Sequence, residues 1–448
     1  MNSVSSRRSR LLPVLAIALV LGTSGCGIFK GNGDASKTPT VGERIPILSR
    51  IESGAKVAPE LADVAVILPP QEANAEWAQA GGTANKAYGH LALGQSPTRV
   101  WTASVAGASN KRRLAAAPVI GDGRLFVYDT SGVVSAFNAE TGAKLWSHPF
   151  SSGENDNAIF GGGASYDAGN VYVTTGLGEV AALNAADGSE KWRVKPAGPL
   201  RGSPTIGFEA VYVMTQDNQI IALNAADGKQ LWSESASVSQ AGVFGVAAPA
   251  AGQGTIVAGY SSGELVAYRY ENGRQLWSDA LARTSISTEV GSLTDVDADP
   301  IIDRGRVFAL GQGGRMAAYE LVTGQRIWEL NLAGISTPAV AGDWVFTLTD
   351  RGQLLAIQRT TGKVRWMNEL QRYRKPEKRK DPVFWVGPVL AGNRLWVANS
   401  LGQLSYANPA DGTLTPYAEL DASISLPPVV ANQTLYLLDD SGTITAYR

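Results

Sequence analysis

The sequence predicts an all-β fold, an eight-bladed β-propeller with four-stranded blades, on the basis of three observations. The frame Ala, five residues, Gly, three residues, Trp recurs six times, with neighbouring copies 38 to 51 residues apart. Each copy follows a stretch with two further strand patterns, so that one unit holds four strands. The two ends of the chain also complement each other. A repeat of this length with one glycine turn per unit is typical of a propeller rather than a helical solenoid.

The copy at residues 220–232 shows how half of one unit is built. Ile221 and Leu223 alternate with smaller side chains, which is the period-two pattern of a strand. Gly228 supplies the turn, because glycine adopts a positive φ without a Cβ clash. Trp232 then opens the returning strand with a large ring to bury. The six full copies begin at Ala136, Ala182, Ala222, Ala267, Ala318 and Ala356.

The ends of the chain predict how the ring closes. A seventh copy keeps Gly412 but has Pro416 where tryptophan is expected, and the eighth stops at Arg448 before its last strand. A matching strand precedes the first full unit at 99–105, where Trp101 lies 45 residues before Trp146. We therefore expect this N-terminal strand to complete the last blade, which removes an exposed sheet edge.

The first 25 residues have the pattern of a secretory signal peptide. Arginines at 7, 8 and 10 precede an apolar stretch at 11–21, which is too short to span a bilayer. The small residues before Cys26, the only cysteine, resemble a bacterial lipobox, although Thr23 stands where leucine is usual. That resemblance implies cleavage before Cys26, its lipidation with a palmitate-type acyl group, and, because residue 27 is not Asp, a place on the periplasmic face of the outer membrane.

Composition divides the remainder into three parts. Residues 26–60 start at the lipidated cysteine and are rich in Gly, Pro and Ser, which is typical of a flexible tether. Residues 61–97 form a segment before the propeller that we expect to pack across it. Residues 98–448 form the propeller itself, a single closed domain.

Charge and residue content argue against several functions. The formal net charge of −1 argues against a protein that binds nucleic acid. The only two histidines, His90 and His148, provide no cluster for a metal, and neither a cysteine pair nor a haem motif is present. The repeat resembles the propeller of quinoprotein alcohol dehydrogenases. A periplasmic dehydrogenase that uses pyrroloquinoline quinone and a generic tethered protein-binding propeller therefore stay open as alternatives, but we expect neither catalysis nor a cofactor.

Departures from the repeat are the candidate functional positions, because function on a propeller resides in the loops between blades. Leu200 and Arg201 combine an apolar side chain with a bidentate donor, as interface residues often do, although Leu200 could instead tuck under the rim. Asp295, Asp297 and Asp299 alternate on an extended stretch. These acids could bind a cation, pair with basic side chains of a partner, or hold their own loop.

The lipobox, the quinoprotein-like wheel and the stretch Ser287-Thr-Glu to Asp295-Val-Asp297 together resemble the BamB family of outer-membrane assembly lipoproteins. The resemblance implies a non-catalytic scaffold in the β-barrel assembly complex. It implies docking to the periplasmic POTRA repeats of BamA through Leu200, Arg201, Asp295 and Asp297, while Gly198 departs from the apolar residue of the family. Other assembly subunits and unfolded outer-membrane proteins are further implied partners of a protein that is monomeric within its complex.

A basic run at 372–380 is not explained by this resemblance. Six of its nine residues are Lys or Arg. The run is interpreted as a solvated loop, with contact to anionic lipid or to an acidic partner as the alternatives.

Overall fold

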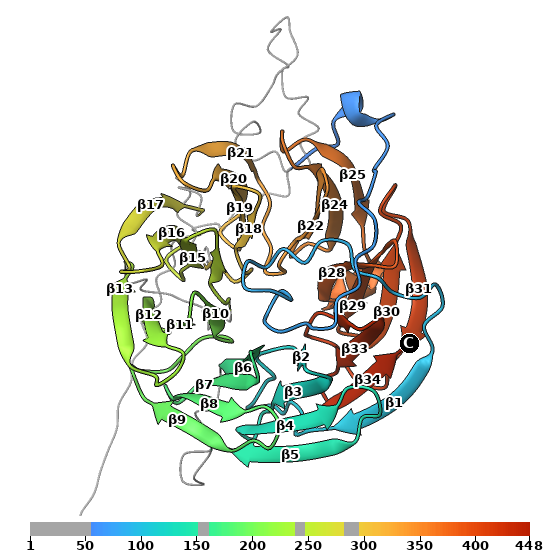
Figure 1. Ribbon diagram of the computed structural model, residues 1–448. Coiled ribbons are helices and arrows are strands. Elements are labelled where there is room, and N and C mark those ends of the chain that lie inside the picture. The colour runs from blue at the N-terminus through green and yellow to red at the C-terminus, as the bar shows by residue number, and fades with distance from the viewer. Residues whose placement is uncertain (1–54, 151–160, 238–246, 282–294) are drawn as a thin grey trace, which may run out of the picture. The chain divides into compact units, whose positions relative to one another are not determined.

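The computed structural model describes residues 55–150, 161–237, 247–281 and 295–448, and these residues build a ring of β-sheets around a central axis (Figure 1). Eight four-stranded sheets form the blades, and a separate two-stranded hairpin accompanies them. The predicted eight-bladed β-propeller is therefore confirmed. The described residues contain only two short 3-10 helices, η1 (Pro59–Leu61) and η2 (Pro376–Lys378), and no helix that is long and apolar enough to cross a membrane.

Each blade is an antiparallel sheet whose strands follow one another outward from the axis. The first four such blades comprise β2 (Val119–Gly121), β3 (Arg124–Tyr128), β4 (Val133–Asn138) and β5 (Lys144–Pro149); β6 (Gly162–Asp167), β7 (Asn170–Thr175), β8 (Val180–Asn184) and β9 (Glu190–Val194); β10 (Thr205–Gly207), β11 (Ala210–Met214), β12 (Gln219–Asn224) and β13 (Gln230–Ser235); and β14 (Ala250–Gly252), β15 (Thr255–Gly259), β16 (Glu264–Arg269) and β17 (Gln275–Ala280).

The remaining sheets continue the ring. They comprise β18 (Ile301–Asp303), β19 (Arg306–Gly311), β20 (Arg315–Glu320) and β21 (Arg326–Leu330); β22 (Ala339–Ala341), β23 (Trp344–Leu348), β24 (Gln353–Gln358) and β25 (Val364–Glu369); the hairpin β26 (Tyr373–Lys375) and β27 (Lys380–Pro382); β28 (Trp385–Ala391), β29 (Arg394–Asn399), β30 (Gln403–Ala407) and β31 (Leu414–Glu419); and β32 (Val429–Ala431), β33 (Thr434–Leu438), β34 (Thr443–Tyr447) and β1 (Arg99–Ser104).

The last blade is closed by the N-terminal strand, as predicted. β1 pairs antiparallel with β34, with Thr102 opposite Thr445. Beyond the strand ends, the backbones of Thr98 and Arg448 exchange two hydrogen bonds of 2.7 and 2.8 Å. The first strand of the propeller and the C-terminal strand therefore hold each other, and the sheet that would otherwise end at β34 is completed.

The repeated Trp and Gly lock neighbouring blades together. The Trp192 indole N–H donates to the Ala225 carbonyl of the next blade at 3.0 Å. Gly228 of that turn has φ +72°, and a Cβ there would lie 2.7 Å from the Trp192 ring. Glycine is required for both reasons, positive φ and close approach. The seven indole-to-carbonyl pairs are Trp101–Ala139, Trp146–Ala185, Trp192–Ala225, Trp232–Tyr270, Trp277–Leu321, Trp328–Arg359 and Trp366–Pro409.

The joint where the chain ends meet is built differently. Pro416 replaces the tryptophan, and the neighbouring blade has no turn between β34 and β1 for an indole to contact. Instead the Tyr417 hydroxyl donates to the Pro97 carbonyl. A cleft of about 400 Å³, lined in part by Trp385, Pro416 and Tyr417, remains beside this joint.

Residues 74–92, which we call the strap, run across the central axis and touch almost every blade (Figure 1). Backbone or amide hydrogen bonds join the strap to the innermost strands of seven blades. These bonds link Asn74 to Val430, Trp77 to Ile120, Ala78 to Tyr166, Gln79 to Ile206, Ala84 to Ala251, Asn85 to Ile302 and Leu91 to Leu390. The strap therefore ties the inner rims of the blades together.

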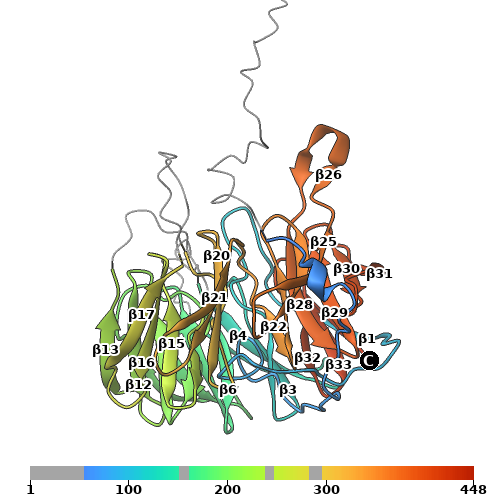
Figure 2. The ribbon, with the colours of Figure 1, turned by 90° about the horizontal axis from the view of Figure 1, so that it is seen from above.

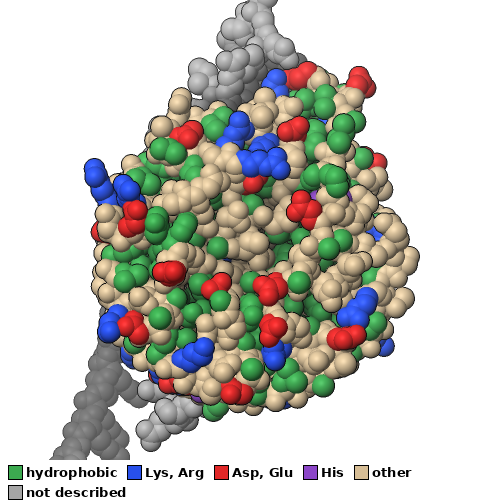
Figure 3. Space-filling model, in the orientation of Figure 1, with side chains coloured by type: hydrophobic (Ala, Val, Ile, Leu, Met, Phe, Trp, Pro, Cys, Tyr) green, Lys and Arg blue, Asp and Glu red, His purple; other side chains and the backbone are tan. Residues whose placement is uncertain are grey.

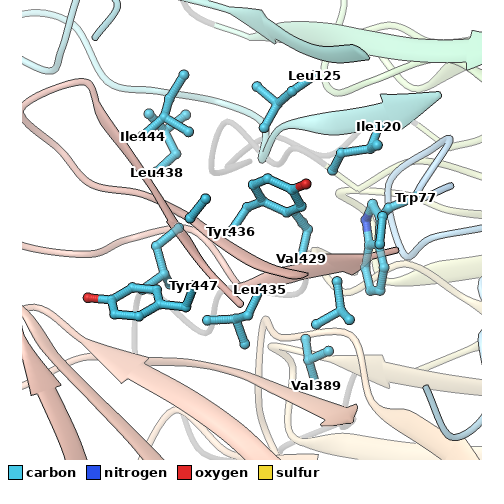
Figure 4. Close-up of a cluster of buried hydrophobic side chains, with 14 of the residues drawn as sticks. Trp77, Ile120, Leu125, Val389, Val429, Leu435, Tyr436, Leu438, Ile444 and Tyr447 are labelled. Atoms are coloured by element: carbon cyan, nitrogen blue, oxygen red, sulfur yellow. The ribbon is translucent and has the colours of Figure 1, made fainter. Parts of the chain in front are cut away.

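The core lies between blades, and the strap contributes to it. Figure 4 shows Trp77 of the strap beside Ile120, Val389 and Val429, which come from three different blades. Trp77 is 4% exposed and its ring lies 4.9 Å from that of Tyr88. Burial of such a ring contributes a few kcal/mol, roughly 25 cal/mol per Å² of apolar surface.

Candidate functional site: a buried ion cluster joins two loops

The two candidate loops lie on the same face of the ring. The first connects β9 to β10 through residues 195–204. The second connects β17 to β18 and is described at residue 281 and from residue 295 onward. Each runs from the outermost strand of one blade to the innermost strand of the next. Connections of this kind emerge on one face of a propeller, while the turns within blades that carry the repeated glycines lie on the other.

Leu200 is buried, which differs from the exposed apolar anchor that its position between Pro199 and Arg201 suggested. Its backbone forms a bridge with Thr215, so its side chain turns inward between two blades. There it packs with Val180 and Val213, and its exposure is 0%. Leu200 thus fixes the loop to the core, the alternative that the sequence left open.

Arg201 and the two acids meet each other at the centre of the site. An Arg201 terminal nitrogen, Nη2, donates to Asp295 Oδ1 at 2.7 Å and lies 3.4 Å from Asp297 Oδ1. The side chains of Arg201, Asp295 and Asp297 are 2%, 1% and 11% exposed. The structure therefore brings three of the predicted site residues together across 94 positions of sequence, as an ion cluster within the chain. We call these three residues the ion cluster.

The charges of the ion cluster do not balance if both acids are ionised. One guanidinium faces two carboxylates that are largely removed from water. Burial, followed by the charge of the Asp295 carboxylate, raises the pKa of Asp297 to about 7, although Arg201 opposes the shift. Burial also raises the pKa of Asp295. A proton on Asp297 near neutral pH would leave one cation and one anion, the arrangement that burial favours.

Asp299, the third acid of the alternating run, does not belong to the ion cluster. Asp299 Oδ1 accepts a hydrogen bond of 2.7 Å from the Ala248 backbone N–H, and its own N–H donates to Thr337 Oγ1 at 3.0 Å. The buried Lys86 of the strap donates to Thr205 Oγ1 at 3.1 Å. Burial lowers the pKa of Lys86 to about 8, while the charge of Asp299 raises it. Sequence reasoning missed Lys86, because a single lysine in the strap carries no pattern.

Partly or fully exposed residues surround the buried cluster. Gly198 and Pro199 are exposed on the first loop, and the neighbouring turn contributes Gln216 and Asp217. The Gln216 N–H donates to the Pro199 carbonyl at 2.9 Å, which ties that turn to the loop. On the second loop Asp297 is the cluster member closest to solvent.

The cysteine and the two histidines singled out in the sequence lie away from the ion cluster or outside the described residues. Cys26 lies outside the described residues. In the part of the chain that the structure describes, His90 Nδ1 lies 2.8 Å from the Pro69 carbonyl and His148 Nδ1 lies 3.1 Å from the Gly188 carbonyl. The same part contains no group of three or more His, Cys, Asp or Glu side chains placed to hold a metal ion.

Comparison with known proteins identifies relatives over most of the chain. A family model described as "Outer membrane protein assembly factor BamB" matches residues 91–158 and 130–368. The chain is 32% identical to the outer membrane protein assembly factor BamB of Salmonella typhimurium, over 78% of this chain and 88% of the relative. It is 31% identical to that of Escherichia coli K12, with the same coverage of both chains.

Solved structures share the fold. The crystal structure of BamB from Moraxella catarrhalis matches with a TM-score of 0.66 and 21% identity, over 79% of this chain and 99% of that one. A quinohemoprotein alcohol dehydrogenase from Comamonas testosteroni matches with a TM-score of 0.67 and 14% identity, over 83% and 80%. At these identities the likeness shows the propeller alone. The sequence relatives go further, and the chain belongs to the BamB family of outer membrane protein assembly factors.

Proposed function

We propose that this protein is a non-catalytic scaffold of the outer-membrane β-barrel assembly complex. In this proposal the loops at 195–204 and 281–300 dock the periplasmic POTRA repeats of BamA, and the rigid ring holds the two loops in fixed positions. The scaffold is anchored by lipid on Cys26 to the periplasmic face of the outer membrane. At that membrane face the scaffold would also contact other subunits of the complex and unfolded outer-membrane proteins.

One observation carries this proposal beyond the family relationship. Arg201 of the first loop bonds to Asp295 of the second at 2.7 Å, so that two loops from different blades form one surface. A single surface made of two rigidly linked loops suits recognition of a folded partner better than two independent loops do, because less ordering entropy is lost on binding.

The burial of the four predicted residues supports a different role in docking for each of them. Leu200, Arg201 and Asp295 hold the loops in position, whereas Asp297 and the exposed Pro199 lie where a partner can contact them. Loss of the buried residues should therefore weaken docking by releasing the loops. Asp297 should act both as a contact and as a member of the ion cluster.

The test is capture of BamA from detergent-solubilised outer membrane by the tagged protein. The variants are Leu200→Ala/Arg201→Ala and Asp295→Ala/Asp297→Ala, each shown by circular dichroism to be folded. Arg359→Ala/Asp303→Ala is the matched control, because this pair also joins an Arg to an Asp of a neighbouring blade, near the turns of the opposite face. We expect both loop variants to lose BamA and the control to keep it.

Each contrary outcome has a definite meaning. Equal capture by folded loop variants and wild type would refute the site, and loss of BamA by the control as well would mean that general destabilisation explains the effect. No capture by wild type would refute the scaffold function.

The anchor is tested separately, since Cys26→Ala should move the protein from the membrane fraction to the soluble periplasm.

A further inference from the structure

The basic run at 372–380 forms an ordered hairpin rather than an irregular loop. Strands β26 and β27 pair through Tyr373 and Pro382, and η2 turns the chain between them. Figure 2 shows this hairpin projecting beyond the blades at one face of the ring. It follows β25 and precedes β28, so it emerges on the same face as the two candidate loops.

The hairpin presents positive charge to solvent. Its basic residues are Arg372, Arg374, Lys375, Lys378, Arg379 and Lys380, and all six are exposed. Two acids, Glu377 and Asp381, belong to the same hairpin, and Asp381 pairs with Lys375 at 3.0 Å. The excess is four positive charges within a chain of formal net charge −1. On the strap face, by contrast, acidic and basic side chains are interspersed (Figure 3).

An exposed aromatic ring accompanies the charge, and the base of the hairpin is firmly attached. Phe384, two residues after β27, is 64% exposed. Its backbone N–H donates to Ser400 Oγ at 3.0 Å. The neighbouring Trp385 is buried and its indole N–H donates to the Gln371 carbonyl at 2.9 Å. The ring and the basic side chains are therefore presented together from a fixed base.

The hairpin lies on the side of the ring where the N-terminal tether arrives. The described chain first meets the ring at β25, where Val57 bridges Val364 and Lys363 pairs with Glu60 at 2.8 Å. The hairpin begins directly after the other end of the same strand. Figures 1 and 2 both show η1 on the side of the ring that holds β25.

We propose that the β26–β27 hairpin, with Phe384, contacts anionic phospholipid headgroups and sets the orientation of the ring against the membrane. The proposal rests on the lipid anchor at Cys26 and not on docking to BamA. Basic side chains with an interfacial aromatic ring are the combination that anionic bilayer surfaces favour. The flexible tether keeps the ring at a raised effective concentration near the bilayer, so a weak contact of the hairpin is sufficient.

An acidic protein surface is the competing ligand for the same charges, and the structure favours lipid. The basic side chains come from both strands and from η2 of a narrow two-stranded hairpin. Point charges on flexible side chains fit a fluid layer of phosphates without defined geometry. Phe384 adds a group that can enter the headgroup region.

The experiment uses the complete mature chain, produced without acylation, in flotation with vesicles. One set of vesicles is phosphatidylethanolamine alone and the other includes phosphatidylglycerol. The hairpin variant is Arg374→Glu/Lys378→Glu/Lys380→Glu. The control, Lys144→Glu/Lys191→Glu/Lys229→Glu, changes the charge equally at exposed lysines near the turns of the opposite face.

We expect wild type and control to bind anionic vesicles, with binding that weakens as salt rises. The hairpin variant should bind at least roughly tenfold more weakly, since each basic side chain at an anionic surface contributes about a fivefold gain. Phe384→Ser should reduce binding without changing its salt dependence. All variants should still capture BamA, which separates this proposal from the docking function.

Three results would overturn the proposal. Wild type that does not bind anionic vesicles would remove the lipid contact altogether. A control variant as weak as the hairpin variant would show that net charge, not the hairpin, is responsible. A hairpin variant that keeps vesicle binding but loses a protein partner would assign the hairpin to an acidic protein surface instead.

Discussion

Replacing Arg201 by Met is the sharpest test of the ion cluster as the link between the two loops. The substitution keeps the apolar stem and removes the guanidinium from a site where its side chain is 2% exposed. Two carboxyls then share a buried space without their cation. Removal of one partner from a buried ion pair costs about 3–5 kcal/mol, because the remaining charge stays desolvated.

That free energy translates into a measurable change in melting temperature. Unfolding entropy near 60 °C is about 2.1 cal/mol/K per residue, so the roughly 360 residues that the structure describes have about 0.8 kcal/mol/K. A loss of 3–5 kcal/mol therefore lowers Tm by about 4–6 °C. The assay is thermal unfolding by circular dichroism at several scan rates, because large rings often unfold irreversibly.

The cost should also depend on pH in a defined direction. Without Arg201 the pKa values of both acids should rise further, so the folded state keeps protons that the unfolded chain releases as pH rises. The cost should therefore be smaller at pH 5 than at pH 8. The triple variant Arg201→Met/Asp295→Asn/Asp297→Asn removes every charge and should recover most of the lost stability. An Arg201→Met protein that melts within about a degree of wild type at pH 8 would refute the reasoning.

Three further predictions concern the acids, the turns and the strap. Asp297 has a pKa raised to about 7 in the folded protein, so the folded state binds an extra proton between about pH 4 and pH 7 and loses stability as pH rises through that window. Asp297→Asn should reduce this loss of unfolding free energy by about 1–3 kcal/mol, as measured by denaturant unfolding at pH 5 and at pH 8. Gly228→Ala adds a Cβ 2.7 Å from the Trp192 ring at φ +72° and should lower the unfolding free energy by about 3 kcal/mol. Gly123 has a similar φ of +69° but no atom within 4 Å of an added Cβ, so Gly123→Ala should lower it by about 1 kcal/mol. Equal losses would mean that the contact with Trp192 is unimportant. Trp77→Ala should cost about 3–5 kcal/mol and make the strap sensitive to limited proteolysis, and an unchanged digestion pattern would contradict its role in holding the blades.

The repeat was predictable because its information is local. A turn glycine and an indole recur in register, and each blade makes the same contacts with the next. The closing strand was predictable for the same reason, since Trp101 continues the series and donates to Ala139 like its six counterparts. Pro416 is the exception that the structure explains: the blade it faces has no turn to contact.

The expectation that residues 61–97 pack across the propeller gave none of the strap's individual contacts, because these join backbone groups and the side-chain amides of Asn74 and Gln79 to positions far apart in sequence. Gln79 and Ile206, for example, exchange hydrogen bonds across 127 residues. No periodicity or motif encodes such a contact. The same applies to Lys86, whose burial depends on where the strap crosses the axis.

The sequence singled out the residues of the two loops, but it did not predict that they contact one another. Alternation placed Asp295 and Asp297 on one side of an extended chain, which is how both can face Arg201. The sequence held no signal that the partner of these acids lies 94 residues away in the same chain. Leu200 and Arg201 read as interface residues because apolar and bidentate side chains serve interfaces and buried joints equally well.

The ion cluster could serve docking in two ways, by holding the two loops in position or by presenting a charge to the partner. A buried ion pair can often be replaced by apolar residues without loss of stability, so stability alone does not require the ion cluster. A stable, fully neutral cluster that still captures BamA would mean that the loops need only be linked. A stable neutral cluster that fails to capture it would mean that the charge at Asp297, the member nearest to solvent, is itself part of the recognised surface. The neutral triple variant therefore separates the two roles that Asp297 has in the proposed function.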